Sequence, residues 1–316
     1  MPEKENGLYY SDREDSYKEV VPEIETPKAK VTFTRPEGLD AEKWFEEAER
    51  RQKARAETED VYDYAKIELV SDRPVCIGIT GDWHLGSTID TEMLKRDVDI
   101  MANHPLVSGV FLMGDLTDSA NFNPAQDEAF LSLEEQRAWM LSILDYIGKD
   151  RILAMWKGNH DHKWERKNGI SKYAGLSKRY EAPVFYGSAF IDLYVNDVNY
   201  RLMGSHRLMG SSIYNNAHPA VRGHREVQGL DLVFAGHTHR KGFSEQPVKE
   251  FNKSRMTYSL MSGTYQLENE FTKDSGYRKQ SGAELGMYWV LFDHAMKQMR
   301  IMDTDQMIKT MWKYMQ

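Results

Sequence analysis

Residues 75–84 read VCIGITGDWH: a short, mostly apolar run is followed at once by glycine and then by Asp82 and His84. The same pattern occurs four more times, as GVFLMGDLTD (109–118), ILAMWKGNHD (152–161), YRLMGSHR (200–207) and LVFAGHTH (232–239). Short apolar runs of this kind are typical of strands that are buried on both faces. We therefore predict five buried strands, each of which ends in a polar cluster that contains glycine.

The segments around these strands predict an α/β fold. Helices are expected at about 91–103 and 126–147, so strands and helices alternate as in a mainly parallel sheet. Four further runs predict hairpins or antiparallel strands that form a second sheet. They are VYDYAKIELV (61–70), AFIDLYVNDVNYRLM (189–203), TYSLMSGTY (257–265) and MYWVLFD (287–293). The expected fold class is α/β, with two packed mixed β-sheets flanked by helices.

Residues 1–60 differ in charge from the rest of the chain. They contain 17 acidic and 11 basic residues, a net charge of −6, which leaves −2 of the total of −8 for residues 61–316. One helix is expected there, with Asp40 as its N-cap and its end near Ala56. We predict a charged N-terminal extension, 1–60, followed by a catalytic domain, 61–316.

The remaining bulk properties favour a cytoplasmic protein. Cys76 is the only cysteine, which excludes an intramolecular disulfide and a cysteine-rich zinc site. No run approaches the roughly 18 apolar residues that a membrane-spanning helix needs. The N-terminus also lacks the basic and apolar regions of a secretory signal. We expect no membrane partner.

Polar side chains at the five strand ends have the chemistry of metal ligands. Ligands of open α/β sheets bind beyond the carboxyl ends of the strands, so clusters that reach this edge can converge on one site. Imidazoles, carboxylates and one amide suit manganese, iron, zinc or cobalt rather than calcium. The candidate ligands are Asp82, His84, Asp115, Asn159, His206, His237 and His239. His218 and His224 compete with His206, which is preferred because it directly follows a strand and a Gly-Ser turn.

The ordered series GDWH, GDLTD, GNHD, GSHR and GHTH resembles the calcineurin-like metallophosphoesterase superfamily over about residues 74–240. The resemblance implies a four-layer sandwich with two divalent ions, most often Mn²⁺, in which a metal-bridging hydroxide attacks phosphorus in line. It implies a first ion on Asp82, His84, Asp115 and His239, and a second on Asp115, Asn159, His206 and His237. It assigns His160 as general acid or phosphate contact, with Asp161 orienting it. Many relatives are dimers, so a homo-oligomer is an expectation.

The substrate is less sharply indicated. Protein Ser/Thr phosphatases of this superfamily carry arginine after the last Asp of the second motif and GNHE in the third, whereas this chain has Asp118-Ser119 and GNHD. A surplus of 13 basic over 7 acidic residues between Lys157 and Lys241 favours a polyanion such as DNA, RNA or a nucleotide.

Several side chains near the motifs are candidates for substrate contact. Arg207 and Arg240 each follow a predicted ligand and are expected to reach phosphate oxygens, and His162 lies just beyond GNHD. Trp83, Trp164 and Tyr173 are candidates for stacking on bases, although such aromatics are more often core residues. Residues 119–126 are expected to form a specificity loop.

Three functions therefore remain. The preferred one is a phosphodiesterase or nuclease acting on nucleic acid or nucleotides. The alternative is a phosphomonoesterase for a small metabolite or phosphopeptide. A non-catalytic scaffold of the same fold is disfavoured because no ligand position of the pattern is missing.

Overall fold

The computed structural model describes residues 41–58, 62–119, 130–169, 171–250, 253–267 and 284–315. The chain divides into two compact units, Met1–Arg55 and Ala56–Gln316. Helix α1, Ala41–Thr58, confirms the helix expected in the N-terminal region, while its predicted N-cap, Asp40, lies outside the described residues. Within these residues no helix is long and apolar enough to cross a membrane.

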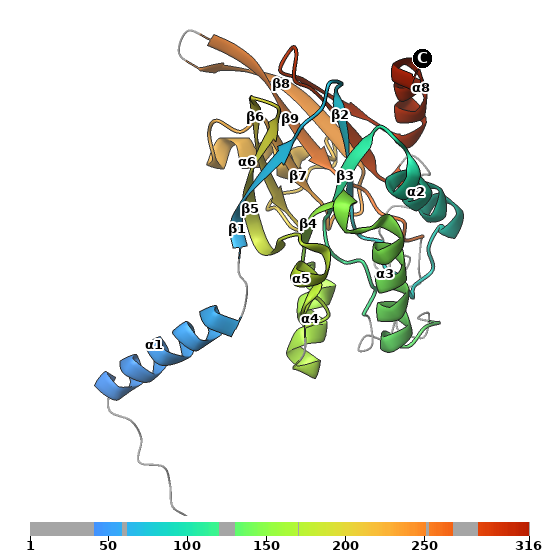
Figure 1. Cartoon of the computed structure of the whole chain (residues 1–316). Helices are drawn as coiled ribbons and strands as arrows, with labels where there is room; N and C mark the ends of the chain where they lie inside the picture. Colours follow the sequence, from blue (N-terminus) through green and yellow to red (C-terminus); the bar gives the residue numbers. More distant parts are fainter. Residues whose placement is uncertain are drawn as a thin grey trace, which may run out of the picture. The chain divides into compact units, whose positions relative to one another are not determined.

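The second unit is built on one mixed sheet, whose order in the described residues is β11-β10-β2-β3-β4-β5-β6-β7-β9-β8, with β1 paired to β5 (Figure 1). The strands are β1 Tyr62–Leu69, β2 Val75–Thr80, β3 Val107–Leu112, β4 Ile152–Trp156, β5 Val184–Val195, β6 Val198–Ser205, β7 Leu232–Ala235, β8 Gly242–Glu250, β9 Lys253–Met261, β10 Tyr288–Asp293 and β11 Gln298–Met302. The five strands predicted from the repeated pattern are β2, β3, β4, β6 and β7.

The sheet folds back on itself, so that two halves pack face to face. Strands β4 and β5 share only two residue pairs, Met155 with Val184 and Trp156 with Phe185, and this short ladder joins the halves. Across the interior, the ring of Phe111 stacks on that of Phe234 with centroids 5.3 Å apart. The expected α/β fold with two packed mixed layers is confirmed. The two layers belong to one sheet, because the short ladder between β4 and β5 connects them.

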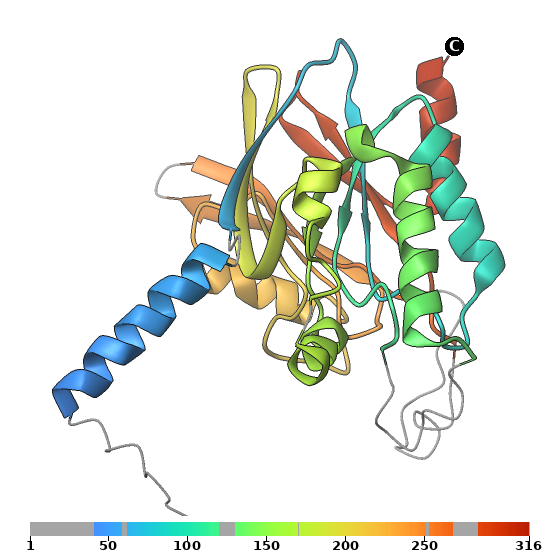
Figure 2. The ribbon, with the colours of Figure 1, turned by 60° about the horizontal axis from the view of Figure 1, so that its bottom comes forward.

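Helices cover the outer faces of both halves. On the first half, α2 (Thr91–Asn103) and α3 (Leu133–Ile147) lie side by side (Figure 2), and α5 (Leu176–Tyr180) and α8 (Thr304–Met315) pack into the same apolar cluster. On the second half, α6 (His218–Glu226) packs on β6 and β7 through Ala220, Met203 and Val233. Asp90 caps α2, and Ser132 with Glu135 forms a capping box at α3, as expected for helix starts.

Two strand assignments from the sequence were wrong. Strand β10 is antiparallel to its neighbours, as predicted, but it pairs with β2 and β11 in the first half and not in the second sheet. Strand β1 was expected in an antiparallel arrangement, but it pairs parallel with β5. The hairpin β5–β6 is confirmed, and Asn196 in its turn has a φ of 54°. Pairing partners of buried strands depend on contacts between distant segments, which apolar content does not specify.

Candidate metal centre

Five candidate ligands sit on strained backbone at strand ends. Positive φ angles are found at Asp82 (49°), His84 (50°), Asp115 (49°), His237 (71°) and His239 (55°). A non-glycine residue in this left-handed region of backbone conformation costs roughly 1–2 kcal/mol of folding free energy, and such residues gather at functional sites. All five residues lie just beyond the ends of β2, β3 and β7.

Glycines allow these carboxylates to approach the neighbouring backbone. A Cβ atom on Gly158 would lie 2.0 Å from Asp115 Oδ1, and one on Gly236 would lie 2.6 Å from Asp82 Oδ2. The space that glycine leaves open is therefore occupied by the side chain of a predicted ligand. This explains physically why glycine is needed at these two positions.

The first group of ligand atoms comes from Asp82, His84 and His239. Nε2 of His239 lies 3.4 Å from Asp82 Oδ1, and Nε2 of His84 lies 3.9 Å from the same oxygen. The two imidazole nitrogens are 3.0 Å apart. Asp82 Oδ1 is buried, so an oxygen and two ring nitrogens face one small space.

The second group is centred on Asp115. His206 Nε2 lies 3.1 Å from Asp115 Oδ2 and 3.0 Å from Asn159 Oδ1, and the ring centroid of His237 lies 5.2 Å from that of His206. Nδ1 of His206 donates to the carbonyl of Met113 at 2.6 Å, which leaves Nε2 directed at the site. His206 is thus among these ligand atoms, whereas Nε2 of His224 contacts the carbonyl of Tyr258.

The three sets of ligand atoms overlap. Asp82, His84 and His239 form one set, His84, Asp115 and His160 a second, and Asp115, His206 and His237 a third, with all atoms of a set within 4.8 Å of one another. Asp115 and His84 each belong to two sets. Nitrogen and oxygen donors in this arrangement fit transition-metal ions.

Burial and mutual contact set the pKa values of these groups. Burial opposes the charge of Asp115, but nearby His206 outweighs it and holds the pKa of this carboxyl well below its usual value. For His206 burial also acts against the charged form, and Asp115 nevertheless raises its pKa to about 10. Burial, together with His206, lowers the pKa of His237 to about 4. Burial likewise lowers the pKa of His84.

His160 is oriented differently from the expectation. Its backbone amide donates to Asp115 Oδ1 at 2.9 Å, and its Nδ1 donates to the carbonyl of Asp118. Asp161 had been expected to orient His160, but its carboxylate accepts from the amides of Gly158 and Asp115 and pairs with Lys172. The cause is helix α4 (Asn159–Asn168). Asp161 is its third residue, and its carboxylate accepts a hydrogen bond from the backbone amide of Gly158 at the helix start.

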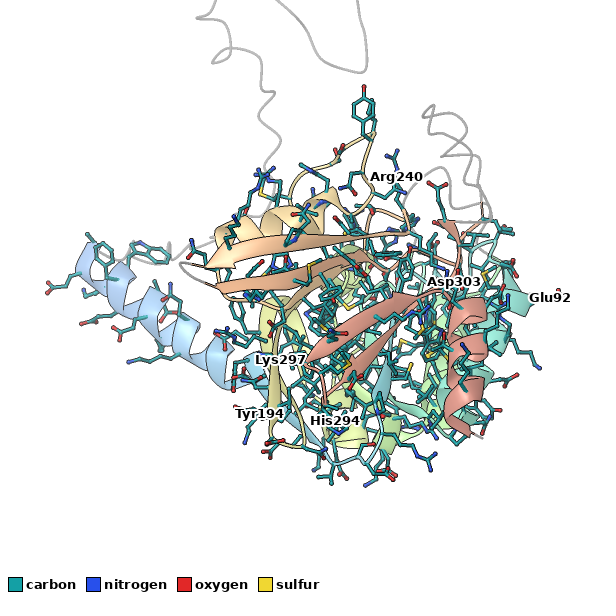
Figure 3. The ribbon with its side chains drawn as sticks, turned by 90° about the horizontal axis from the view of Figure 1, so that it is seen from above. Glu92, Tyr194, Arg240, His294, Lys297 and Asp303 are labelled. Atoms are coloured by element: carbon teal, nitrogen blue, oxygen red, sulfur yellow. The ribbon has the colours of Figure 1, made fainter. Side chains whose placement is uncertain are left out.

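The candidate substrate contacts have mixed outcomes. Arg207 is exposed and Arg240 is partly exposed, and in Figure 3 the Arg240 side chain points outward from the margin of the molecule. His162 is half-buried, with its ring 6.2 Å from that of Tyr186. Trp83 and Tyr173 are buried in the core, which confirms the more common role of such aromatics and leaves them no exposed face for a base. Most of the expected specificity loop, residues 120–126, lies outside the described residues.

Sequence reasoning missed two features near the centre. Lys172 is 2% exposed and contacts Asp161, although it lies outside every motif. Tyr214 is 93% exposed on the loop that follows His206 and Arg207. This loop is held near the fifth motif, because Asn216 Nδ2 donates to the carbonyl of Lys241 at 3.0 Å. Neither residue belongs to a recurring pattern: Lys172 is identified by its contacts, and Tyr214 by its exposure and the position of its loop.

One comparison with known proteins identifies the family. A model of the family described as calcineurin-like phosphoesterase matches residues 77–241, more than half of the chain. No curated protein sequence matches. Similar solved structures include a metallophosphoesterase from Sphaerobacter thermophilus, with 12% identity, coverage of 75% of this chain and 94% of that chain, and a TM-score of 0.36. Another is the calcineurin-like phosphoesterase YfkN from Bacillus subtilis, with 12% identity, coverage of 73% and 89%, and a TM-score of 0.38.

Proposed function

This chain belongs to the calcineurin-like phosphoesterase family, and we propose that it hydrolyses phosphodiester bonds in nucleic acid or nucleotides with the help of two divalent metal ions. The observation that carries the proposal is the position of Asp115 within two overlapping sets of ligand atoms. Mn²⁺ is the proposed ion, because the donor set mixes imidazole nitrogens with carboxylate and amide oxygens.

The residues of the centre have distinct proposed roles. Asp82, His84 and His239 would hold one ion, Asn159, His206 and His237 the other, and Asp115 both. Bound ions of this kind supply an activated water and offset the negative charge of the phosphate. His160, whose Nδ1 donates to the Asp118 carbonyl, presents Nε2 to the substrate and would donate a proton or a hydrogen bond to the leaving oxygen.

The surroundings of the centre support a nucleic-acid or nucleotide substrate over a small phosphomonoester. Arg207 directly follows the ligand His206, is exposed, and is suited to bind phosphate oxygens beyond the reacting one. Tyr214 on the same loop offers a free aromatic face on which a base can stack. The basic surplus is a weaker argument, because Lys157 and Lys172 are buried in ion pairs and do not contribute to a surface.

The test compares hydrolysis of bis-p-nitrophenyl phosphate with that of p-nitrophenyl phosphate in the presence of Mn²⁺, for the wild-type protein and for Asp115→Asn. We expect the diester to be cleaved faster, and Asp115→Asn to reduce turnover by at least ~10²-fold, since changes that merely support a ligand already cost 10–100-fold. Exclusive cleavage of the monoester would favour the phosphomonoesterase alternative. Equal rates for the folded, Mn²⁺-loaded Asp115→Asn protein would refute the centre itself.

A positive result is followed by a panel of single-stranded DNA, duplex DNA, RNA and cyclic nucleotides, each with Mn²⁺, Zn²⁺ and Co²⁺. The Asp115→Asn protein serves as the control for contaminating nucleases. Cleavage of polynucleotides by the wild type alone would support the substrate class proposed here. Absence of cleavage for every phosphoester, together with Mn²⁺ binding, would favour the scaffold.

A further inference from the structure

A buried lysine lies directly behind the metal centre. The side chain of Lys172 is almost completely buried, and its ammonium group is 2.7 Å from Asp161 Oδ1. It also donates to the hydroxyl groups of Thr117 and Ser119. Its ammonium group is therefore surrounded by a carboxylate of the third motif, a hydroxyl of the second motif and the hydroxyl of the residue that follows it.

One of these contacts reaches the ligand Asp115. The other oxygen of Asp161, Oδ2, accepts from the backbone amides of Asp115 (3.2 Å) and Gly158 (2.8 Å). The ion pair with Lys172 thus sets the position of a carboxylate that holds the backbone of Asp115, which has a φ of 49°, and the start of helix α4. Asn159 and His160 are the first two residues of that helix.

The other two contacts lie on either side of Asp118. Thr117 and Ser119 are its chain neighbours, and both hydroxyl groups accept from Lys172. Asp118 in turn contacts two histidines of the centre: its Oδ1 lies 3.0 Å from His84 Nδ1, and its carbonyl accepts from His160 Nδ1. The orientation of both imidazoles therefore depends on a segment that Lys172 anchors.

We propose that Lys172 is a positioning residue that holds the second and third motifs in the geometry needed to bind metal and to orient His160. The part of this inference that concerns catalysis rests on the proposed function. Lys172 contributes no ligand atom, and its burial keeps it away from substrate, so it acts only through Asp161, Thr117 and Ser119. Buried ion pairs are often replaceable by apolar residues without loss of stability, which favours a geometric role over a purely stabilising one.

The chain offers a matched control. Lys157 is also buried, its ammonium group is 2.8 Å from Glu165 Oε1, and Glu165 is on the same helix as Asp161, one turn further along. The side chains of Lys157 and Glu165 have no hydrogen bond or ion pair to any ligand of the centre among the described contacts. Both ion pairs thus join a buried lysine to an acidic residue of α4, but only the pair of Lys172 and Asp161 is hydrogen-bonded to the backbone of a candidate ligand.

The experiment compares three variants of the full-length chain with the wild type: Lys172→Met, the double variant Lys172→Met/Asp161→Asn, and the control Lys157→Met/Glu165→Gln. The double variants remove both charges of a pair, so that no uncompensated charge is left buried. Mn²⁺ binding is measured by isothermal titration calorimetry, folding by circular dichroism, and kcat and KM with bis-p-nitrophenyl phosphate.

We expect the Lys172→Met/Asp161→Asn protein to fold and to bind Mn²⁺ about 10–100-fold more weakly than the wild type, the range found when support of a metal ligand is removed. At saturating Mn²⁺ its kcat should fall by a similar factor, whereas KM should stay within about threefold because substrate contacts are intact. The Lys157→Met/Glu165→Gln protein should match the wild type within about twofold in Mn²⁺ affinity and kcat.

Three outcomes would overturn the inference. The first is wild-type Mn²⁺ affinity and kcat in the folded Lys172→Met/Asp161→Asn protein. The second is an equal loss of Mn²⁺ affinity and kcat in the Lys157→Met/Glu165→Gln control. The third is that the Lys172→Met/Asp161→Asn protein fails to fold while the control folds, which would assign Lys172 to stability alone. Failure of the proposed function is distinguishable, because a wild type that cleaves no phosphoester still allows the Mn²⁺ affinities to be compared.

Discussion

His206 Nε2 lies 3.1 Å from Asp115 Oδ2, with both side chains buried. The two candidate ligands satisfy each other in the absence of metal, because a protonated imidazole beside a carboxylate forms an ion pair. A bound ion must replace this proton, since histidine ligates only in its neutral form. Binding of metal and release of a proton are therefore linked at this centre.

The linkage predicts a pH dependence of metal affinity. Asp115 raises the pKa of His206 to about 10 against the effect of burial, so at pH 7 His206 is protonated in the metal-free protein and must lose that proton on binding. Apparent Mn²⁺ affinity should then rise by about tenfold per pH unit between roughly pH 7 and 9. Calorimetry in buffers of different ionisation enthalpy counts the protons released. Release of no proton at pH 7 would contradict this prediction.

The same pair predicts an effect of pH on the stability of the metal-free protein. The pKa of His206 is higher in the folded than in the unfolded state, so its stabilising contribution is fully present below the unfolded value of about 6.5 and is lost as pH rises towards 10. Urea unfolding of the chelated protein at pH 7 and pH 9.5 measures this loss. His206→Gln, which cannot titrate, should show a smaller difference between the two pH values.

Removal of metal should lower the thermal midpoint. Ions that bind only the folded state stabilise it by about 2.7 kcal/mol at a concentration of 100 Kd, which for a domain of this size corresponds to roughly 5–10 °C. Differential scanning fluorimetry with EDTA and then with added Mn²⁺ tests this. The Asp115→Asn protein should show a much smaller shift, and an equal shift would place the stabilising ion elsewhere.

Gly158→Ala should disrupt the centre through a single methyl group. The backbone of Gly158, with φ −92° and ψ 178°, is open to alanine, but the new Cβ would lie 2.0 Å from Asp115 Oδ1. Asp115 must move, so we expect Mn²⁺ affinity to fall by about tenfold or more. Gly187→Ala is the control, because nothing lies within 4 Å of its added Cβ. Wild-type affinity in Gly158→Ala would argue against the observed position of Asp115.

Tyr214→Ala should separate substrate binding from chemistry. If Tyr214 stacks on a base, its loss removes about 1–3 kcal/mol of binding, equivalent to roughly 5–150-fold in KM for a single-stranded oligonucleotide. Turnover of bis-p-nitrophenyl phosphate, which has no base, should not change. Equal KM values of the two proteins for the oligonucleotide would remove Tyr214 from the substrate path.

Much of the site was readable from the sequence because its signal is local. The strands β2, β4 and β7 coincide with the apolar runs 75–80, 152–156 and 232–235, since a buried strand needs apolar side chains on both faces. The polar clusters follow directly, and the carboxyl ends of neighbouring parallel strands meet at one edge. The identity of these strands and of the polar clusters at their ends therefore follows from residue order alone.

What the tertiary structure alone decided is how distant segments meet. The antiparallel placement of β10 beside β2, the contact of His160 with the Asp118 carbonyl rather than with Asp161, and the burial of Lys172 behind two motifs all join residues far apart in the chain. Such contacts depend on packing and on the pairing of every buried polar group, which no local pattern encodes. Residue types and spacing determined which atoms can bind metal, and the folded sheet determined which side chains hold those atoms in place.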